Sequence, residues 1–204
     1  MERIAGPKGL RTAAAIRRAG LKLIYRHGFG AMSLRDLASE VGIQASSLYN
    51  HIRTKQDLLF DLIREHMDAL LAQTDAALAA VPDTATERLR AFIRHHIVYH
   101  LEKKQDVFIA NFELRSLEPQ HYATIVAMRR AYESKLIAVL DSGVAEGAFD
   151  IRDTRITAYS ILAMLTGVCT WYKPEGRLTK SEIVELHTNL VLHGCVAHCD
   201  DARS

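Results

Sequence analysis

The sequence predicts an all-α protein in which a small N-terminal bundle of three helices precedes a larger helical domain, with about nine helices in total. Apolar residues recur at steps of three and four along most of the 204 residues, which is the period of an amphipathic helix. β-branched residues rarely alternate with polar ones over the length of a strand. The chain holds four prolines, so little interrupts its helices.

Two short helices near the N-terminus are bounded by a cap and a glycine. Ser33, with Asp36 three residues later, is typical of an N-terminal cap. Gly42 is expected to end that helix, because only glycine adopts a left-handed conformation without steric cost. The second short helix is expected from Ala45 or Ser46 to His51. Two helices joined by such a turn can present the second one to the major groove of DNA.

The remaining helices follow from apolar periodicity and from further start and stop signals. Thr84 with Glu87 and Thr179 with Glu182 are typical of capping boxes, and Pro119 fits a first helical turn. The expected ranges are Arg11 or Thr12 to His27 with Gly28 as its end, Lys55 to Val81, residue 84 to Lys103, Asp106 to Leu117, Glu118 to Gly143, Asp153 or Thr154 to Trp171, and Thr179 to Ala197.

Charge is divided unevenly along the chain. Residues 1–60 carry ten lysines or arginines against four acidic residues, whereas residues 61–204 carry sixteen against twenty. A basic N-terminal part joined to a mildly acidic one is typical of a nucleic-acid reader fused to another domain. No apolar run approaches the roughly 18 residues of a membrane span, and no signal-peptide core is found at the start, so we expect a cytoplasmic protein. The three cysteines, Cys169, Cys195 and Cys199, suit a reducing compartment.

Residues 33–59 resemble the helix-turn-helix signature of the tetracycline-repressor (TetR) family of bacterial transcription regulators. Residues of the expected kind stand at Ala38, Gly42, Ile43, Ser47, Leu48, Tyr49, His51, Lys55 and Leu58, while Ile52 replaces the usual phenylalanine and Thr54 the commoner serine or asparagine. The resemblance implies phosphate contacts by Tyr49, His51 and Lys55, and the polar residues around them are candidates for reading bases. The predicted DNA-binding residues are Ser33, Arg35, Gln44, Ser46, Ser47, Tyr49, Asn50, His51 and Lys55.

Residues 171–179, WYKPEGRLT, and residues 112–133 resemble a TetR subgroup whose members often sense acyl-CoA thioesters. The resemblance implies an apolar effector held in the C-terminal domain, with arginines available for phosphates. The candidate ligand-binding residues are Phe92, His96, Phe108, Phe112, Arg115, Ile125, Met128, Arg129, Leu162 and Trp171. Ordinary core packing for the apolar members, and a solvated helix face for the arginines, are the alternative interpretations.

The last two long helices are apolar over most of their circumference, so each needs two buried faces. One face can cover the subunit's own core and the other a symmetry mate, which predicts a homodimer. His95, His96 and His100 invite a metal hypothesis, but the further ligands, Glu113 or His121, would be guesses, so we expect no metal and no cofactor. No catalytic motif is present, and we expect no enzyme.

The combined prediction is a dimeric TetR-type regulator, most simply a repressor, that binds a palindromic double-stranded DNA operator and is released by a small apolar effector such as an acyl-CoA. Residues 1–54 form the DNA-binding domain and residues 55–204 the ligand-binding and dimerisation domain in this interpretation. Two alternatives remain open: a drug-sensing regulator of an efflux system, and a helical small-molecule-binding protein without DNA function.

Overall fold

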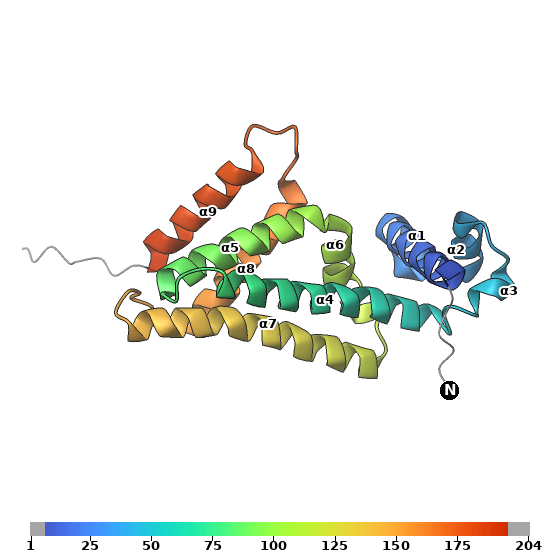
Figure 1. Ribbon diagram of the computed structural model, residues 1–204, viewed down its shortest axis with the longest axis horizontal. Coiled ribbons are helices and arrows are strands. Elements are labelled where there is room, and N and C mark those ends of the chain that lie inside the picture. Colours follow the sequence, from blue (N-terminus) through green and yellow to red (C-terminus); the bar gives the residue numbers. More distant parts are fainter. Residues whose placement is uncertain (1–6, 196–204) are drawn as a thin grey trace, which may run out of the picture. The chain divides into compact units, whose positions relative to one another are not determined.

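The computed structural model describes residues 7–195, and these residues contain nine α-helices and one short 3-10 helix (Figure 1). They divide into two compact units, one made of residues up to Asp68 together with Lys104–Val126, the other of Ala69–Lys103 together with the residues from Ala127 onward. The all-helical architecture predicted from periodicity is confirmed. Within the described part of the chain, no helix is long and apolar enough to cross a membrane.

The first unit is built around the N-terminal helices. It holds α1 (Pro7–Ala31), α2 (Leu34–Val41), α3 (Ala45–Leu48), the first part of α4 (Lys55–Ala79), α6 (Lys104–Phe112), the 3-10 helix η1 (Leu114–Ser116) and the start of α7 (Pro119–Ala145). Helix α1 packs against both α2 and α6. The core side chains include Ile16, Ile24, Leu37, Leu48, Leu58, Leu59, Ile63 and Ile109.

Capping explains why α2 has the bounds predicted for it. The Ser33 hydroxyl accepts a hydrogen bond from the Asp36 N–H, and the Asp36 carboxylate accepts one from the Ser33 N–H, each at 3.1 Å. At the other end Gly42 has φ 72° and ψ 34°, and its N–H donates to the carbonyls of Ala38 and Ser39. The following turn brings the chain directly into α3.

Helix α1 differs from its predicted range at both ends. It begins at Pro7, since a proline in the first turn costs no helical hydrogen bond. Gly28 does interrupt the helix, with φ 78° and ψ 157°, but a further helical turn continues to Ala31. That conformation is accessible almost only to glycine.

The second unit contains the rest of α4 and α7 together with α5 (Ala85–Glu102), α8 (Thr154–Trp171) and α9 (Lys180–Cys195). Helix α5 packs against α8 and α9 (Figure 1). The core includes Leu89, Phe92, Ile93, Ile97, Leu136, Leu140, Leu165, Val168 and Ile183.

The helix starts in this unit follow the sequence signals. Thr84 caps α5, Asp153 caps α8, and the Thr179 hydroxyl accepts a hydrogen bond from the Glu182 N–H. The predicted end of the last helix, Ala197, lies outside the described residues.

Candidate functional site

The α2–turn–α3 segment presents one apolar face to the core and one polar face to solvent. Leu37, Ala38 and Leu48 are buried. Of the predicted DNA-binding residues here, Gln44, Ser46, Tyr49 and Asn50 are exposed, and Ser47 and His51 are half-buried. Tyr49 is 58% exposed, so its phenol is accessible on this face. This face offers hydroxyl, amide, phenol and imidazole groups, which can bond to base edges and phosphates.

Ser33 and Arg35 occupy the N-terminal end of α2. The Ser33 hydroxyl lies 2.6 Å from Asp36 Oδ2, so it serves the capping box. These hydrogen bonds from Ser33 lower the pKa of Asp36 below its ordinary value. Arg35 is exposed next to this cap. The N-terminal end of α2 therefore carries an exposed guanidinium beside backbone amides.

Lys55 begins α4 and also holds the last turn of α1. Its Nζ donates to the carbonyl oxygen of Gly30 at 3.1 Å and lies 4.4 Å from the centroid of the Phe29 ring. The Thr54 hydroxyl accepts a hydrogen bond from the Asp57 N–H at 3.0 Å and so caps the same helix. Lys55 is thus fixed at the start of α4, on the first unit.

A buried polar cluster surrounds His96 in the second unit. His96 Nδ1 lies 2.8 Å from the Tyr132 hydroxyl, and Nε2 lies 3.1 Å from the Thr166 hydroxyl. The ring of His100 stacks on that of His96 with 3.7 Å between centroids, and its Nδ1 lies 2.8 Å from the His96 carbonyl oxygen. Burial lowers the pKa of His96 well below its ordinary value and raises that of Tyr132. His96 and Tyr132 are therefore neutral and hydrogen-bonded at neutral pH.

The candidate ligand-binding residues fall into both units. In the second unit the Phe92 ring lies 6.1 Å from the His96 ring and 5.4 Å from the Tyr132 ring, between centroids. In the first unit the Phe108 ring lies 4.5 Å from that of Phe112. Arg115, Ile125 and these two phenylalanines belong to the first unit, and Phe92, His96, Met128, Arg129, Leu162 and Trp171 belong to the second.

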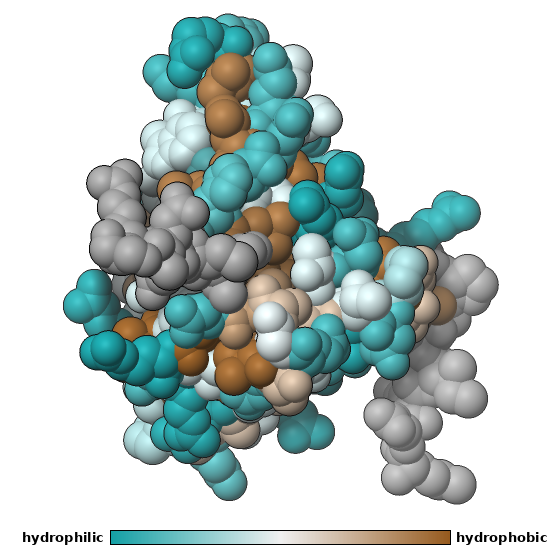
Figure 2. Space-filling model, turned by 90° about the vertical axis from the view of Figure 1, so that its left-hand side faces the viewer, coloured by the Kyte–Doolittle hydropathy of each residue, from teal (hydrophilic) through white to brown (hydrophobic). Residues whose placement is uncertain are grey.

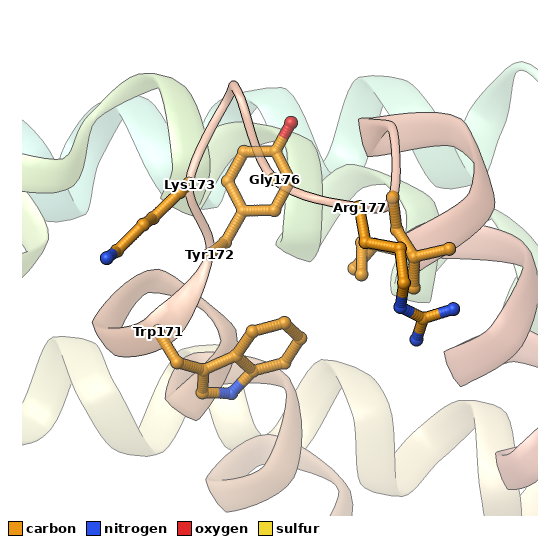
Figure 3. Close-up of a pocket in the computed structure, with 7 residues that line it drawn as sticks. Trp171, Tyr172, Lys173, Gly176 and Arg177 are labelled. Carbon is orange, nitrogen blue, oxygen red and sulfur yellow. The ribbon is translucent and has the colours of Figure 1, made fainter.

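The loop between α8 and α9 forms a small open cavity of about 230 Å³ (Figure 3). It is lined by Trp171, Tyr172, Lys173, Gly176, Arg177, Leu178 and Ile183. In Figure 3 the Tyr172 ring lies inside the loop near Gly176, and the Trp171 indole lies below it. Trp171 is 53% exposed, and its ring centroid is 6.2 Å from that of His187. The WYKPEGRLT segment is therefore a surface feature of the second unit.

Helices α8 and α9 leave large apolar side chains in solvent. Ile156, Tyr159 and Trp171 on α8 and Leu186 and Leu190 on α9 are exposed, Leu190 by 61%. Ile156 and Tyr159 are three residues apart and Leu186 and Leu190 are four apart, so each pair lies along one side of its helix. Apolar surface is visible between polar side chains in the space-filling view (Figure 2). Apolar side chains gathered in this way are typical of a protein interface.

The histidine-rich segment does not gather metal ligands. Within residues 7–195 no group of three or more His, Cys, Asp or Glu side chains is arranged to hold a metal ion. Glu113 accepts hydrogen bonds from the Phe29 N–H and the Ser116 hydroxyl, and His121 stacks on Phe60 with 4.1 Å between centroids. Cys199 lies outside the described residues.

Sequence reasoning missed the partners of these residues. Tyr132 and Thr166 are separated from His96 by 36 and 70 positions, and no local pattern links them. Gln56 was given no role and Glu113 was named only as a guessed metal ligand, whereas Gln56 connects α4 to η1 and Glu113 connects the end of α6 to α1. In the sequence Glu113 stands out only as an acidic residue that directly follows the largely apolar segment 107–112.

Comparison with known proteins points to one family. Residues 16–62 match the model of the bacterial regulatory proteins of the tetR family, and residues 82–195 match the tetracyclin repressor-like C-terminal domain. The chain is 26% identical over 196 residues to the HTH-type transcriptional repressor KstR2 of Mycobacterium tuberculosis, covering 95% of this chain and 97% of that protein.

Solved structures agree with this assignment. A bacterial regulatory protein of the tetR family from Rhodococcus RHA1 superimposes with a TM-score of 0.85 at 26% identity, covering 92% of this chain and 98% of that one. AibR in complex with isovaleryl coenzyme A and operator DNA gives a TM-score of 0.81 at 27% identity, covering 88% and 97%. Together with the capped α2–turn–α3 segment, these matches identify the chain as a member of the TetR family of bacterial transcription regulators.

Proposed function

We propose that this regulator is a repressor that binds a palindromic operator as a homodimer and leaves it when a small apolar effector, an acyl-CoA of lipid or aromatic-acid catabolism, is bound. The observation that carries the DNA-binding part is the exposed polar face of α3 on a capped helix-turn-helix. The related KstR2 is named a repressor, and the AibR structure contains both an acyl-CoA and operator DNA. We assign DNA binding to residues 1–54 and ligand binding with dimerisation to residues 55–204, in a cytoplasmic protein.

In this proposal the roles on the DNA side follow from side-chain chemistry. Gln44, Ser46, Ser47 and Asn50 read base edges, while Tyr49, His51 and Lys55 bind phosphates. Ser33 and Arg35 contact the backbone from the start of α2, where amides and a guanidinium favour an anion. The Lys55 ammonium has three donors, so its hydrogen bond to Gly30 leaves two for a phosphate.

A homodimer through α8 and α9 would bury the exposed apolar side chains of those helices. Burying apolar surface contributes roughly 25 cal/mol per Å², so Leu186 and Leu190 are strong candidates for the centre of the contact. A two-fold dimer presents two α3 helices to half-sites separated by whole turns of DNA. The operator is therefore expected to be a palindrome.

The effector part rests on the second unit and on the relatives. Phe92 lies beside His96 and Tyr132, whose side chains are buried and neutral, and this environment suits a carbonyl-bearing acyl group better than a free carboxylate. Met128 and Leu162 supply further apolar surface in the same unit, and Arg129 and the Trp171 loop supply a cation and an aromatic ring for the coenzyme A part. Bound effector favours a conformation in which the two heads no longer fit the half-sites. A release of this kind needs a preference of a few kcal/mol for that conformation.

The DNA-binding proposal is tested by selecting duplexes from a random library with the purified full chain. Enrichment of a two-fold symmetric sequence is expected, with an affinity that falls as salt rises because phosphate contacts release counterions. Tyr49→Ala should weaken binding to the selected duplex and to a scrambled one by similar factors, without lowering the melting temperature. A library from which no sequence is enriched would contradict the proposal.

The effector proposal is tested by adding ligands to the complex with the selected duplex. Isovaleryl-CoA and longer acyl-CoAs should release the protein, whereas free coenzyme A and free fatty acids should not. Release by cationic drugs with no response to any acyl-CoA would instead favour a regulator of an efflux system. In that case the DNA-binding part of the proposal would still stand.

A further inference from the structure

The first unit contains a segment that does not belong to the helix-turn-helix in sequence. Residues 104–126, which comprise α6, η1 and the start of α7, pack with residues up to Asp68. We call this segment the α6–α7 corner. It lies within the part of the chain that matches the C-terminal domain of the family, and it follows α5 and continues along α7 into the second unit. The corner is therefore a covalent connection between the two units that packs on the DNA-binding one.

Glu113, between α6 and η1, joins this corner to the end of α1. Its Oε1 accepts a hydrogen bond from the Phe29 N–H at 3.0 Å, and its Oε2 accepts one from the Ser116 hydroxyl at 2.8 Å. The Phe29 N–H is available because Gly28 breaks α1 directly before it. Both carboxylate oxygens are thus used, one for each side of the connection.

The same turn of α1 is held from its other side by the start of α4. Lys55 donates to the Gly30 carbonyl oxygen, one residue beyond Phe29. Gln56 holds the corner: its Nε2 donates to the Ser116 carbonyl oxygen at 2.8 Å, and its Oε1 accepts from the Glu118 N–H at 3.3 Å. Residues 28–31 lie two residues before the cap of α2, so the orientation of the helix-turn-helix depends on this turn.

We propose that Glu113 is a positioning residue for operator binding: it fixes the turn at residues 28–31 to the α6–α7 corner and so sets the orientation of the helix-turn-helix. The inference rests on the proposed DNA-binding function. Two consequences of removing the Glu113 carboxylate change operator affinity in opposite directions, so the sign of the measured change distinguishes them. Removing an acid from a DNA-binding unit should strengthen attraction to phosphates, whereas losing a positioning contact should weaken binding.

The experiment compares Glu113→Ala, Glu113→Gln and Glu118→Ala in the full chain, with the duplex selected as above. The Glu118 carboxylate is exposed, and in the described part of the chain only its backbone N–H meets Gln56, so Glu118→Ala removes the same charge without breaking the connection. We expect Glu113→Ala to bind the operator about tenfold more weakly, with an unchanged salt dependence. Glu113→Gln, whose amide oxygen can still accept from Phe29, and Glu118→Ala should bind as well as the original protein or better.

Amide hydrogen exchange at Phe29 supplies a readout that does not need DNA. Exchange should be faster in Glu113→Ala than in Glu113→Gln, while exchange in the core of the second unit stays the same. Operator binding by Glu113→Ala equal to that of Glu118→Ala would overturn the inference, and so would an unchanged Phe29 exchange rate. If the original protein selects no duplex, the proposed function fails by itself, and the exchange experiment still decides whether Glu113 holds the turn.

Discussion

Replacing Gly143 with alanine tests the packing of the second unit at one contact. Gly143 lies in the last turns of α7, and a Cβ built on it would be 2.0 Å from Cδ2 and 2.3 Å from Cε2 of Phe149. Nonbonded carbon atoms need about 3.5 Å, so the ring would have to move by about 1.5 Å. Phe149 is buried and follows a tight turn, with its N–H donating to the Gly143 carbonyl oxygen at 3.0 Å. The ring therefore has little room to move.

Two opposed effects set the size of the change. Overpacking of a filled site costs about 1–3 kcal/mol, and the closeness of a whole ring edge puts this case at the upper end. Alanine in place of glycine in a helix recovers about 0.5–1 kcal/mol. The net loss is about 2 kcal/mol of unfolding free energy. For a chain of this size it corresponds to a fall in melting temperature of about 4–8 °C.

The assay is urea unfolding of a double-mutant cycle made of Gly143→Ala, Phe149→Ala and both together. With the ring removed, Gly143→Ala meets no obstacle and should stabilise the protein by about 0.5–1 kcal/mol. The effect of the same substitution thus changes sign between the two backgrounds. A loss of stability of equal size in both backgrounds would refute the reasoning, because the cause could not then be the Phe149 ring.

Three further predictions concern the pH response, a helix cap and the dimer. Burial keeps the pKa of His96 below 6.5 in the folded state, so below pH 6.5 the unfolded chain binds a proton that the folded chain does not. The contribution of His96 to the unfolding free energy should therefore fall by up to about 1.4 kcal/mol per pH unit below pH 6.5 and stay constant above it. His96→Gln should flatten this slope in urea titrations, and an unchanged slope would contradict the prediction. Asp153→Ala should lower the unfolding free energy by about 1 kcal/mol, because it removes the acceptor of the Arg155 and Ile156 N–H groups. Asp150→Ala, at an exposed side chain that caps none of the described helices, should leave the unfolding free energy unchanged in the same urea titration. Leu190→Glu should convert the proposed dimer to monomers in sedimentation velocity, because it places a charge in the α8–α9 interface. Leu10→Glu, at a similarly exposed position on α1, should leave the dimer intact. Identical sedimentation of the two variants would argue against the α8–α9 interface.

The sequence by itself was enough for the fold class, the family and most helix bounds. Two ranges were wrong: the helix predicted over Asp106–Leu117 is divided into α6 and η1, and α3 ends at Leu48 rather than at His51. The correctly predicted features depend on local patterns: apolar period, the Ser33–Asp36 cap, and Gly42 at a position that needs a left-handed residue. The polar face of α3 is likewise local, because four residues of helix and its flanks decide which side chains point away from Leu48.

Only the tertiary structure decided which side chains from distant parts of the chain contact one another. Glu113 meets Phe29 across 84 positions, and His96 meets Thr166 across 70, so neither pairing leaves a periodic signal in the chain. The same is true of Lys55, whose ammonium interacts with the Gly30 carbonyl oxygen and the Phe29 ring. A helix forms through interactions between residues three and four positions apart, which a local pattern records. A hydrogen bond between two elements depends instead on how whole helices pack. That packing is decided by the sum of many weak contacts rather than by any single residue.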